Sequence, residues 1–125
     1  MLLKNDLYQI ISSEKSEDSC TYTLRITDKH PLFKGHFPGS PVLPGVCILQ
    51  IFKELAEENL STEKPLVYSE IKQCKFVTPV AMKQPATLLV TFTLRQEGNA
   101  WNISATMKSE IAIHTTLKAV LTTRQ

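Results

Sequence analysis

The chain lacks the features that mark membrane proteins, secreted precursors and nucleic-acid-binding proteins. None of its apolar stretches approaches the ~20 residues that a membrane-spanning helix requires. The first residues, MLLKNDLYQIISSE, contain no apolar core followed by a small-residue cleavage site, so they do not read as a signal peptide. The net charge of +2 is small, and no basic run alternates with aromatic residues. We therefore expect no membrane and no nucleic acid among its partners.

Cysteine is scarce, and the three thiols form no recognisable pattern. Cys20, Cys47 and Cys74 are widely spaced and belong to no CxxC pair, which argues against a disulfide framework and against a structural zinc site. We expect reduced thiols, a cytoplasmic location and no metal. Cys47 lies in an apolar stretch, where a small buried hydrophobe is a better interpretation than a catalytic nucleophile.

Proline and glycine, in contrast, gather in one short segment. Five of them fall between positions 38 and 45, where prolines fix φ and glycines permit close approach of the backbone. Pro44 suits the first turn of a helix because its missing N–H costs nothing there, and the apolar residues that follow predict a helix from about Pro44 to Glu58. Most of the circumference of this helix is apolar, so a flat sheet would leave part of it uncovered.

A histidine stands just before this stiff turn. The first N–H groups of the helix, including that of Gly45, suit a carbonyl oxygen that gains negative charge during a reaction. The imidazole of His36 suits removal of a proton near neutral pH. The segment therefore predicts a base beside an oxyanion donor, and the alternative is that His36 only braces the turn.

The rest of the chain predicts strands in one domain that spans residues 1–125. The form of Leu7 to Ile11 is left undetermined, and the polar stretch Ser12 to Ser19 is expected to be a loop. Alternating apolar residues predict five strands, two of which are joined by a turn at Gly98 and Asn99. They run over Thr21–Thr27, Leu66–Val77, Ala86–Leu94, Trp101–Lys108 and Ile111–Thr122. The fold class is therefore α+β, with an antiparallel sheet wrapped around one long central helix.

Two segments resemble the signature of a known family. Gly35 to Val46, with the sequence GHFPGSPVLPGV, closely resembles the signature of the hot-dog-fold 3-hydroxyacyl-[acyl carrier protein] dehydratases of fatty acid synthesis. Lys75 to Val80, KFVTPV, is similar to the basic-Phe-x-x-Pro-Val strand end of the same family. Together with the order of strands and helix, the resemblance covers nearly the whole chain.

The resemblance implies a hot-dog fold and a dehydratase that needs no cofactor. It implies that His36 is the base, that the carbonyl of Val42 orients its ring, and that the Gly45 N–H binds the thioester oxygen. It also implies an acyl carrier protein or another acyl thioester as substrate, and a homodimer or a higher homo-oligomer. We expect the remaining substrate-binding residues to be Val46, Phe37 and Phe76.

One position departs from the family. Where the family carries Glu or Asp fourteen residues after its histidine, supplied across the dimer interface, this chain carries Gln50. A glutamine amide donates a hydrogen bond but supplies no proton at neutral pH. Glu54 follows one helical turn later, where the family commonly has Gln. Two interpretations follow: Glu54 supplies the acid, or Glu54 is a solvated or capping charge.

Alternative functions stay open at this stage. Gln50 also suits a thioesterase of the same fold, in which it positions water, and the missing acid suits a non-catalytic acyl-binding or partner subunit. Four lysines flank the motifs and suit an acidic carrier protein, and the alternative is that they only keep their faces solvated; they are Lys34, Lys72, Lys75 and Lys83. His30 and His114 are expected to be surface residues rather than ligands.

Overall fold

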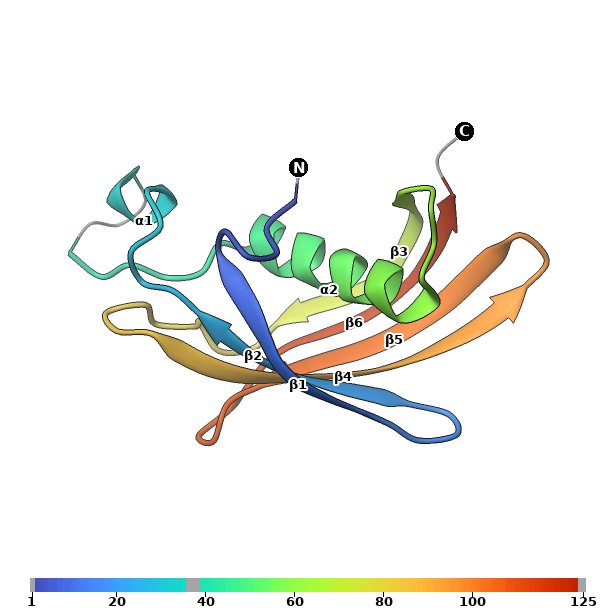
Figure 1. Cartoon of the computed structure of the whole chain (residues 1–125). Coiled ribbons are helices and arrows are strands. Elements are labelled where there is room, and N and C mark those ends of the chain that lie inside the picture. Colours follow the sequence, from blue (N-terminus) through green and yellow to red (C-terminus); the bar gives the residue numbers. More distant parts are fainter. Residues whose placement is uncertain (1, 36–38, 124–125) are drawn as a thin grey trace.

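The computed structural model describes residues 2–35 and 39–123, which form one antiparallel sheet and two helices (Figure 1). The chain runs through two strands, a short helix, a long helix and four further strands. In order, the elements are β1 (Tyr8–Lys15), β2 (Cys20–Ile26), α1 (Leu32–Gly35), α2 (Gly45–Leu60), β3 (Leu66–Phe76), β4 (Ala86–Glu97), β5 (Ala100–Lys108) and β6 (Ile113–Thr123).

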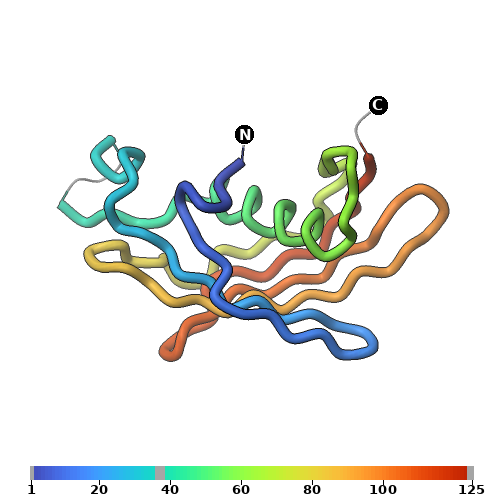
Figure 2. Tube along the Cα trace, in the orientation of Figure 1, coloured from blue at the N-terminus to red at the C-terminus, as the bar shows by residue number. Residues whose placement is uncertain are grey.

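The six strands pair in the order β1-β2-β4-β5-β6-β3, and every pairing is antiparallel. The sheet curves, and α2 lies in its concave side (Figure 2). This arrangement confirms the predicted α+β hot-dog architecture. It also explains how the apolar residues around most of α2 are covered, because a curved sheet covers more of a helix than a flat sheet does.

Local signals account for both ends of α2. Pro44 occupies the N-cap position with extended backbone angles, φ −63° and ψ 145°, and its carbonyl accepts the first helical hydrogen bonds. At the other end Ser61 adopts a left-handed conformation with φ 53°, and its N–H bonds back to the carbonyl of Glu58. The helix therefore begins where the proline pattern predicts and runs two residues beyond the predicted end.

The core forms where α2 meets the inward side chains of the strands. The predicted inward residues of β2, Tyr22, Leu24 and Ile26, are all buried. On the other strands the buried apolar residues include Leu88, Val90, Phe92, Ile103, Ala105, Met107, Leu117 and Leu121. Gly98 and Asn99 form the predicted hairpin turn, in which Gly98 adopts a φ of 60°, a left-handed conformation that glycine takes more readily than other residues.

Two local expectations are wrong. Residues Ser12 to Lys15 belong to β1 rather than to a loop. This strand lies at the edge of the sheet and its register shifts between Ile10 and Ser12, so no regular polar and apolar alternation marks it. Ile113 is half exposed instead of inward, because the β5-β6 register also shifts at this end of β6.

No helix among the described residues is long and apolar enough to cross a membrane.

Candidate active site

The N-terminus of α2 is held in place by a short bridge to the segment after β3. Val42 pairs with Ala81 in an isolated antiparallel bridge. The two hydrogen bonds of the bridge are made by the flanking residues, from Leu43 N to Val80 O at 3.0 Å and from Met82 N to Pro41 O at 2.9 Å. In a bridge of this pattern the N–H and C=O of Val42 itself point away from its partner strand. The carbonyl of Val42 therefore faces the side opposite Ala81.

Phe76, the last residue of β3, lies across the start of α2. A Cβ built on Gly45 would come within 2.7 Å of the Phe76 Cζ atom, so only a glycine leaves room for the ring in its present place. Phe76 is nevertheless 55% exposed, and Val46, the next residue of the helix, is 71% exposed. The structure thus brings Val42, Gly45, Val46 and Phe76 together at one open end of the helix.

His36 and Phe37 lie outside the described residues. The chain enters this segment from Gly35, the last residue of α1, and α2 begins at Gly45 nine residues after His36. Phe33, which precedes it on α1, is buried in the core.

Gln50 and Glu54 are joined directly along α2. The Nε2 atom of Gln50 donates to Glu54 Oε2 at 2.7 Å. Glu54 is only 4% exposed, so the expectation of a solvated charge near the polar end of the helix is wrong. Its carboxylate accepts three further hydrogen bonds, all from the N-terminal segment. The donors are Leu3 N at 2.8 Å, Lys4 N at 2.9 Å and the Tyr8 hydroxyl at 2.9 Å.

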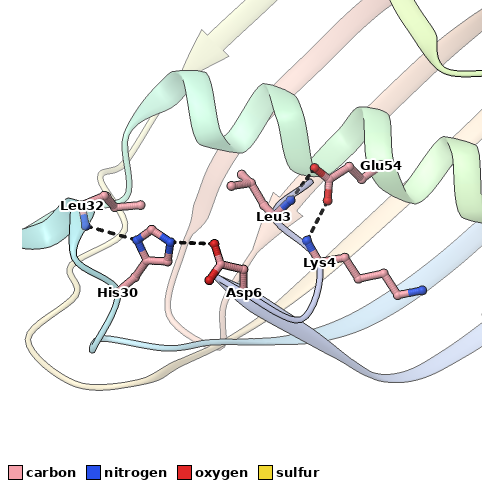
Figure 3. A network of polar contacts seen from close by, with 6 residues as sticks. All are labelled: Leu3, Lys4, Asp6, His30, Leu32 and Glu54. Atoms are coloured by element: carbon pink, nitrogen blue, oxygen red, sulfur yellow. Dashed lines mark hydrogen bonds and ion pairs between the residues drawn. The ribbon is translucent and has the colours of Figure 1, made fainter. Parts of the chain in front are cut away.

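The same N-terminal segment also contacts α1 (Figure 3). Asp6 Oδ2 lies 3.0 Å from His30 Nε2, and the other ring nitrogen of His30 accepts the N–H of Leu32 at 3.1 Å. His30 therefore links the turn before β1 to the helix that leads into the His36 segment.

Burial shapes the other titratable groups near the site. Burial raises the pKa of the Cys47 thiol, which favours its neutral form and agrees with the structural interpretation of this cysteine. His114 is buried rather than exposed, which corrects its expected surface position. Its ring nitrogens lie 2.9 Å from Thr78 O and 2.8 Å from Ser109 Oγ, so the segment after β3 and the β5–β6 connection provide a partner for each.

A hollow of about 670 Å³ lies where α1 meets the segment after β3, with Phe33 and Met82 in its lining. Three lysines line it, Lys29, Lys34 and Lys83, with Asp28 as a counter-charge. Lys72 belongs to a different groove, of about 610 Å³, lined mainly by β4, β5 and β6. Two of the four lysines singled out from the sequence therefore meet around one hollow.

No cluster of three or more His, Cys, Asp or Glu residues that could hold a metal ion occurs in residues 2–35 and 39–123.

The N-terminal contribution to the site escapes sequence reasoning. The contacts of Glu54 with Leu3, Lys4 and Tyr8 span 51, 50 and 46 positions of the chain. The only signal in the sequence is a carboxylate within an apolar helix, and it does not identify the donors.

Comparison with known proteins identifies the family. The family model of the ApeI-like proteins, described as ApeI dehydratase, matches residues 12–115. The 3-hydroxyacyl-[acyl-carrier-protein] dehydratase FabZ of Paramagnetospirillum magneticum is 32% identical over 114 residues, covering 86% of this chain and 68% of that protein. FabZ of Chlamydia trachomatis is 32% identical over 93 residues, covering 69% of this chain. The chain spans only 61% of the length of that relative.

Solved structures share the fold. The dehydratase heterocomplex ApeI:P from Xenorhabdus doucetiae superposes with a TM-score of 0.76 at 22% identity, covering 91% of this chain and 96% of that chain. A probable thioesterase from Bartonella henselae superposes with a TM-score of 0.66 at 14% identity, covering 85% and 90%. At these identities the likeness concerns the fold alone. The family match, which includes most of the chain, shows that this protein belongs to the ApeI-like dehydratase family.

Proposed function

We propose that the protein dehydrates a 3-hydroxyacyl thioester to the trans-2-enoyl thioester. The observation that carries this proposal is the N-terminus of α2, which begins at Gly45 beside the Val42–Ala81 bridge, in a chain of a dehydratase family. In the sequence His36 stands nine residues before Gly45. A helix N-terminus provides N–H groups that stabilise an enolate-like thioester oxygen.

The proposed reaction assigns one role to each residue. His36 removes the α-proton, with its ring oriented by the Val42 carbonyl, while the Gly45 N–H holds the thioester oxygen. Gln50 hydrogen-bonds the 3-hydroxyl but has no proton to give. The protonated His36 therefore returns its proton to the departing hydroxyl, which leaves as water as the C–O bond breaks and the C=C bond forms. Val46, Phe37 and Phe76 line the path of the acyl chain.

Glu54 is a weak candidate for the acid. Its carboxylate is buried and accepts four hydrogen bonds, from Gln50, Leu3, Lys4 and Tyr8. A proton delivered from Glu54 would require these contacts to be broken. The proposal therefore gives Glu54 no proton-transfer step.

An acyl carrier protein is the proposed donor of the substrate. Lys34 and Lys83 line the same hollow, together with Lys29, and a cationic rim suits an acidic carrier protein. The three free thiols agree with a reaction in the reducing cytoplasm.

A homodimer is the proposed assembly. β3 is an eleven-residue strand at the edge of the sheet, and such an edge offers unpaired backbone groups to a second strand. Exposed apolar side chains accompany it, at Ile71, Phe76 and Val77. Pairing of β3 with its copy would cover these side chains and form a closed two-fold assembly.

The proposal is tested with purified protein and a 3-hydroxyacyl carrier-protein thioester. We expect formation of the enoyl product, and a loss of rate of about 10²-fold or more in His36→Ala because its base is removed. Circular dichroism confirms that the variant is folded. Wild-type protein without enoyl product, or an equally active His36→Ala variant, would reject the proposal.

A thioesterase is the second candidate, favoured by the amide at position 50. Here Gln50 would hold a water that attacks the thioester carbonyl. A free-thiol assay on the same substrate separates the two reactions, because hydrolysis releases a thiol and dehydration does not. Activity only in the presence of a second homologous chain would instead favour the partner-subunit interpretation.

A further inference from the structure

The residue at the acid position is held by a buried carboxylate that is itself held by the start of the chain. Gln50 donates to Glu54 Oε2 at 2.7 Å, and Leu3 N donates to the same oxygen at 2.8 Å. Lys4 N and the Tyr8 hydroxyl donate to Oε1, both at 2.9 Å. Each carboxylate oxygen therefore accepts from two donors, and the directions of these four hydrogen bonds determine how the carboxylate is oriented.

Burial makes this arrangement rigid. A carboxylate that is removed from water is strongly unfavourable unless hydrogen bonds replace its hydration. Two of the four donors are backbone N–H groups, whose positions are determined by the turn before β1. Tyr8 is fully buried, and burial and the charge of Glu54 raise its pKa far above the ordinary value, so it stays a donor. Glu54 cannot turn without losing at least one of these bonds.

The fixed carboxylate of Glu54 determines the orientation of the Gln50 amide. An ionised carboxylate only accepts hydrogen bonds, so Gln50 must turn its NH₂ group toward Glu54. Its carbonyl oxygen then points away from Glu54. The amide at the acid position is therefore presented in one of its two possible orientations.

We propose that Glu54 is a positioning residue that orients the Gln50 amide toward the substrate, and that the turn from Leu3 to Tyr8 holds Glu54 in place. The expected effect on kcat rests on the proposed function, because that function assigns Gln50 to the 3-hydroxyl of the substrate. The link between Glu54 and Gln50 is independent of that function. A shift in position of about 1 Å at a reacting group costs on the order of 10²-fold in rate, so a positioning role has a measurable effect.

The turn also contacts both helices that flank His36 in the sequence. Through Glu54 it contacts the middle of α2, and through Asp6 and His30 it contacts the start of α1 (Figure 3). These two helices enclose the segment that contains His36 in the sequence. The N-terminal turn is therefore linked by hydrogen bonds to both helices.

The experiment is a double-mutant cycle on residues 50 and 54. We expect Glu54→Gln to lower kcat by about 10-fold with KM little changed, because Gln50 still stands at the site but in the wrong orientation. In a Gln50→Ala background the same change should alter kcat by no more than about twofold. Glu54→Asp, which keeps the charge but shortens its reach, should recover part of kcat.

Glu57→Gln is the matched control. Glu57 lies on the same helix and likewise accepts a backbone N–H, that of Leu66, at 2.7 Å, but the carboxylate that Gln50 binds is that of Glu54. We expect this variant to keep the kcat of the wild type. A drop in kcat equal to that of Glu54→Gln would assign the effect to general loss of helix packing and overturn the proposal.

A second measurement, NMR spectroscopy of the Gln50 side chain, does not depend on enzymatic activity. The side-chain amide resonances of Gln50, assigned by their disappearance in Gln50→Ala, should shift in Glu54→Gln and Glu54→Asp and stay in place in Glu57→Gln. If the wild type dehydrates nothing, the proposed function fails while this measurement still decides the link. Unchanged Gln50 resonances in both Glu54 variants, or an additive cycle, would overturn the positioning role.

Discussion

At the scale of single residues, Gln50 and Glu54 reverse the order of acid and amide that is common in the resembled dehydratases. The two side chains are hydrogen-bonded across one helical turn, and the carboxylate of Glu54 is buried. It accepts hydrogen bonds from the N-terminal segment. In the proposed reaction, His36 is therefore the one residue assigned to proton transfer.

Gln50→Glu should restore an acid to the site. The change places two carboxyl groups at hydrogen-bonding distance, and like charges that close share a proton, which raises the upper apparent pKa of the pair. We expect kcat to rise by on the order of 10-fold and to fall again as the pH increases through that upper pKa. The measurement is a pH profile of kcat. A rate no higher than that of Gln50→Ala at every pH would contradict this expectation.

Gly45→Ala should separate folding from catalysis. The added methyl group would lie 2.7 Å from the tip of the Phe76 ring, which is exposed and free to swing aside at little cost. We expect thermal unfolding within a few degrees of the wild type, since alanine suits a helix, but a clear loss of kcat/KM. The double variant Gly45→Ala/Phe76→Ala removes the crowding between the methyl group and the ring. If this double variant recovers full activity, the methyl group does not by itself block binding of the thioester.

At the scale of elements, the two edges of the sheet differ. β1 is short, polar over most of its length and interrupted by a register shift. β3 is longer and carries apolar side chains that are exposed in the isolated chain, among them Ile71 at 44%. Natural sheets blunt an edge that stays in water, so the apolar edge at β3 favours a partner there.

Ile71→Lys should weaken the proposed dimer. A lysine at the centre of β3 would bring a charge into the interface, and two copies would face each other across a two-fold axis. We expect a shift toward monomer in sedimentation velocity, with the dimer dissociation constant raised at least ~10-fold. Ile11→Lys on β1, where Ile11 is 56% exposed, is the matched control and should leave the dimer intact. Equal behaviour of the two variants would place the interface elsewhere.

At the scale of the whole molecule, one curved sheet and one helix form the core, and buried phenols lie within it. Tyr8 and Tyr22 are buried among the strands, and burial raises the pKa of both far above the ordinary value. The folded state therefore keeps phenol protons that the unfolded chain loses above about pH 10. Since the folded state then binds more protons, its stability must fall as pH rises in this range.

The free energy of unfolding should accordingly decrease above about pH 10 by ~1.4 kcal/mol per pH unit for Tyr8 alone. Tyr8→Phe should be less stable than the wild type near pH 7, by ~1–3 kcal/mol, because Glu54 loses a donor. The same variant should show a shallower decrease above pH 10. Urea unfolding from pH 7 to pH 11 checks both, and parallel pH curves for the two proteins would contradict the role of Tyr8.

The elements that sequence predicts well are those with local signals. The helix start at Pro44, the Gly98 turn and the inward residues of β2 all follow from proline, glycine and alternation. The failures lie where the structure depends on distant partners. β1 is a strand because β2 pairs with it, and His114 is buried because the segment after β3 folds over it.

The sequence by itself determined the kind of fold, the family and the unusual glutamine, because helix caps, periodic apolar residues and a contiguous motif are local properties. Only the tertiary structure decided what Glu54 does. Its partners lie about fifty positions away in the chain, and their donors are mostly backbone groups that carry no residue-specific signal. A buried carboxylate must find donors, but which ones it finds is a property of the folded chain.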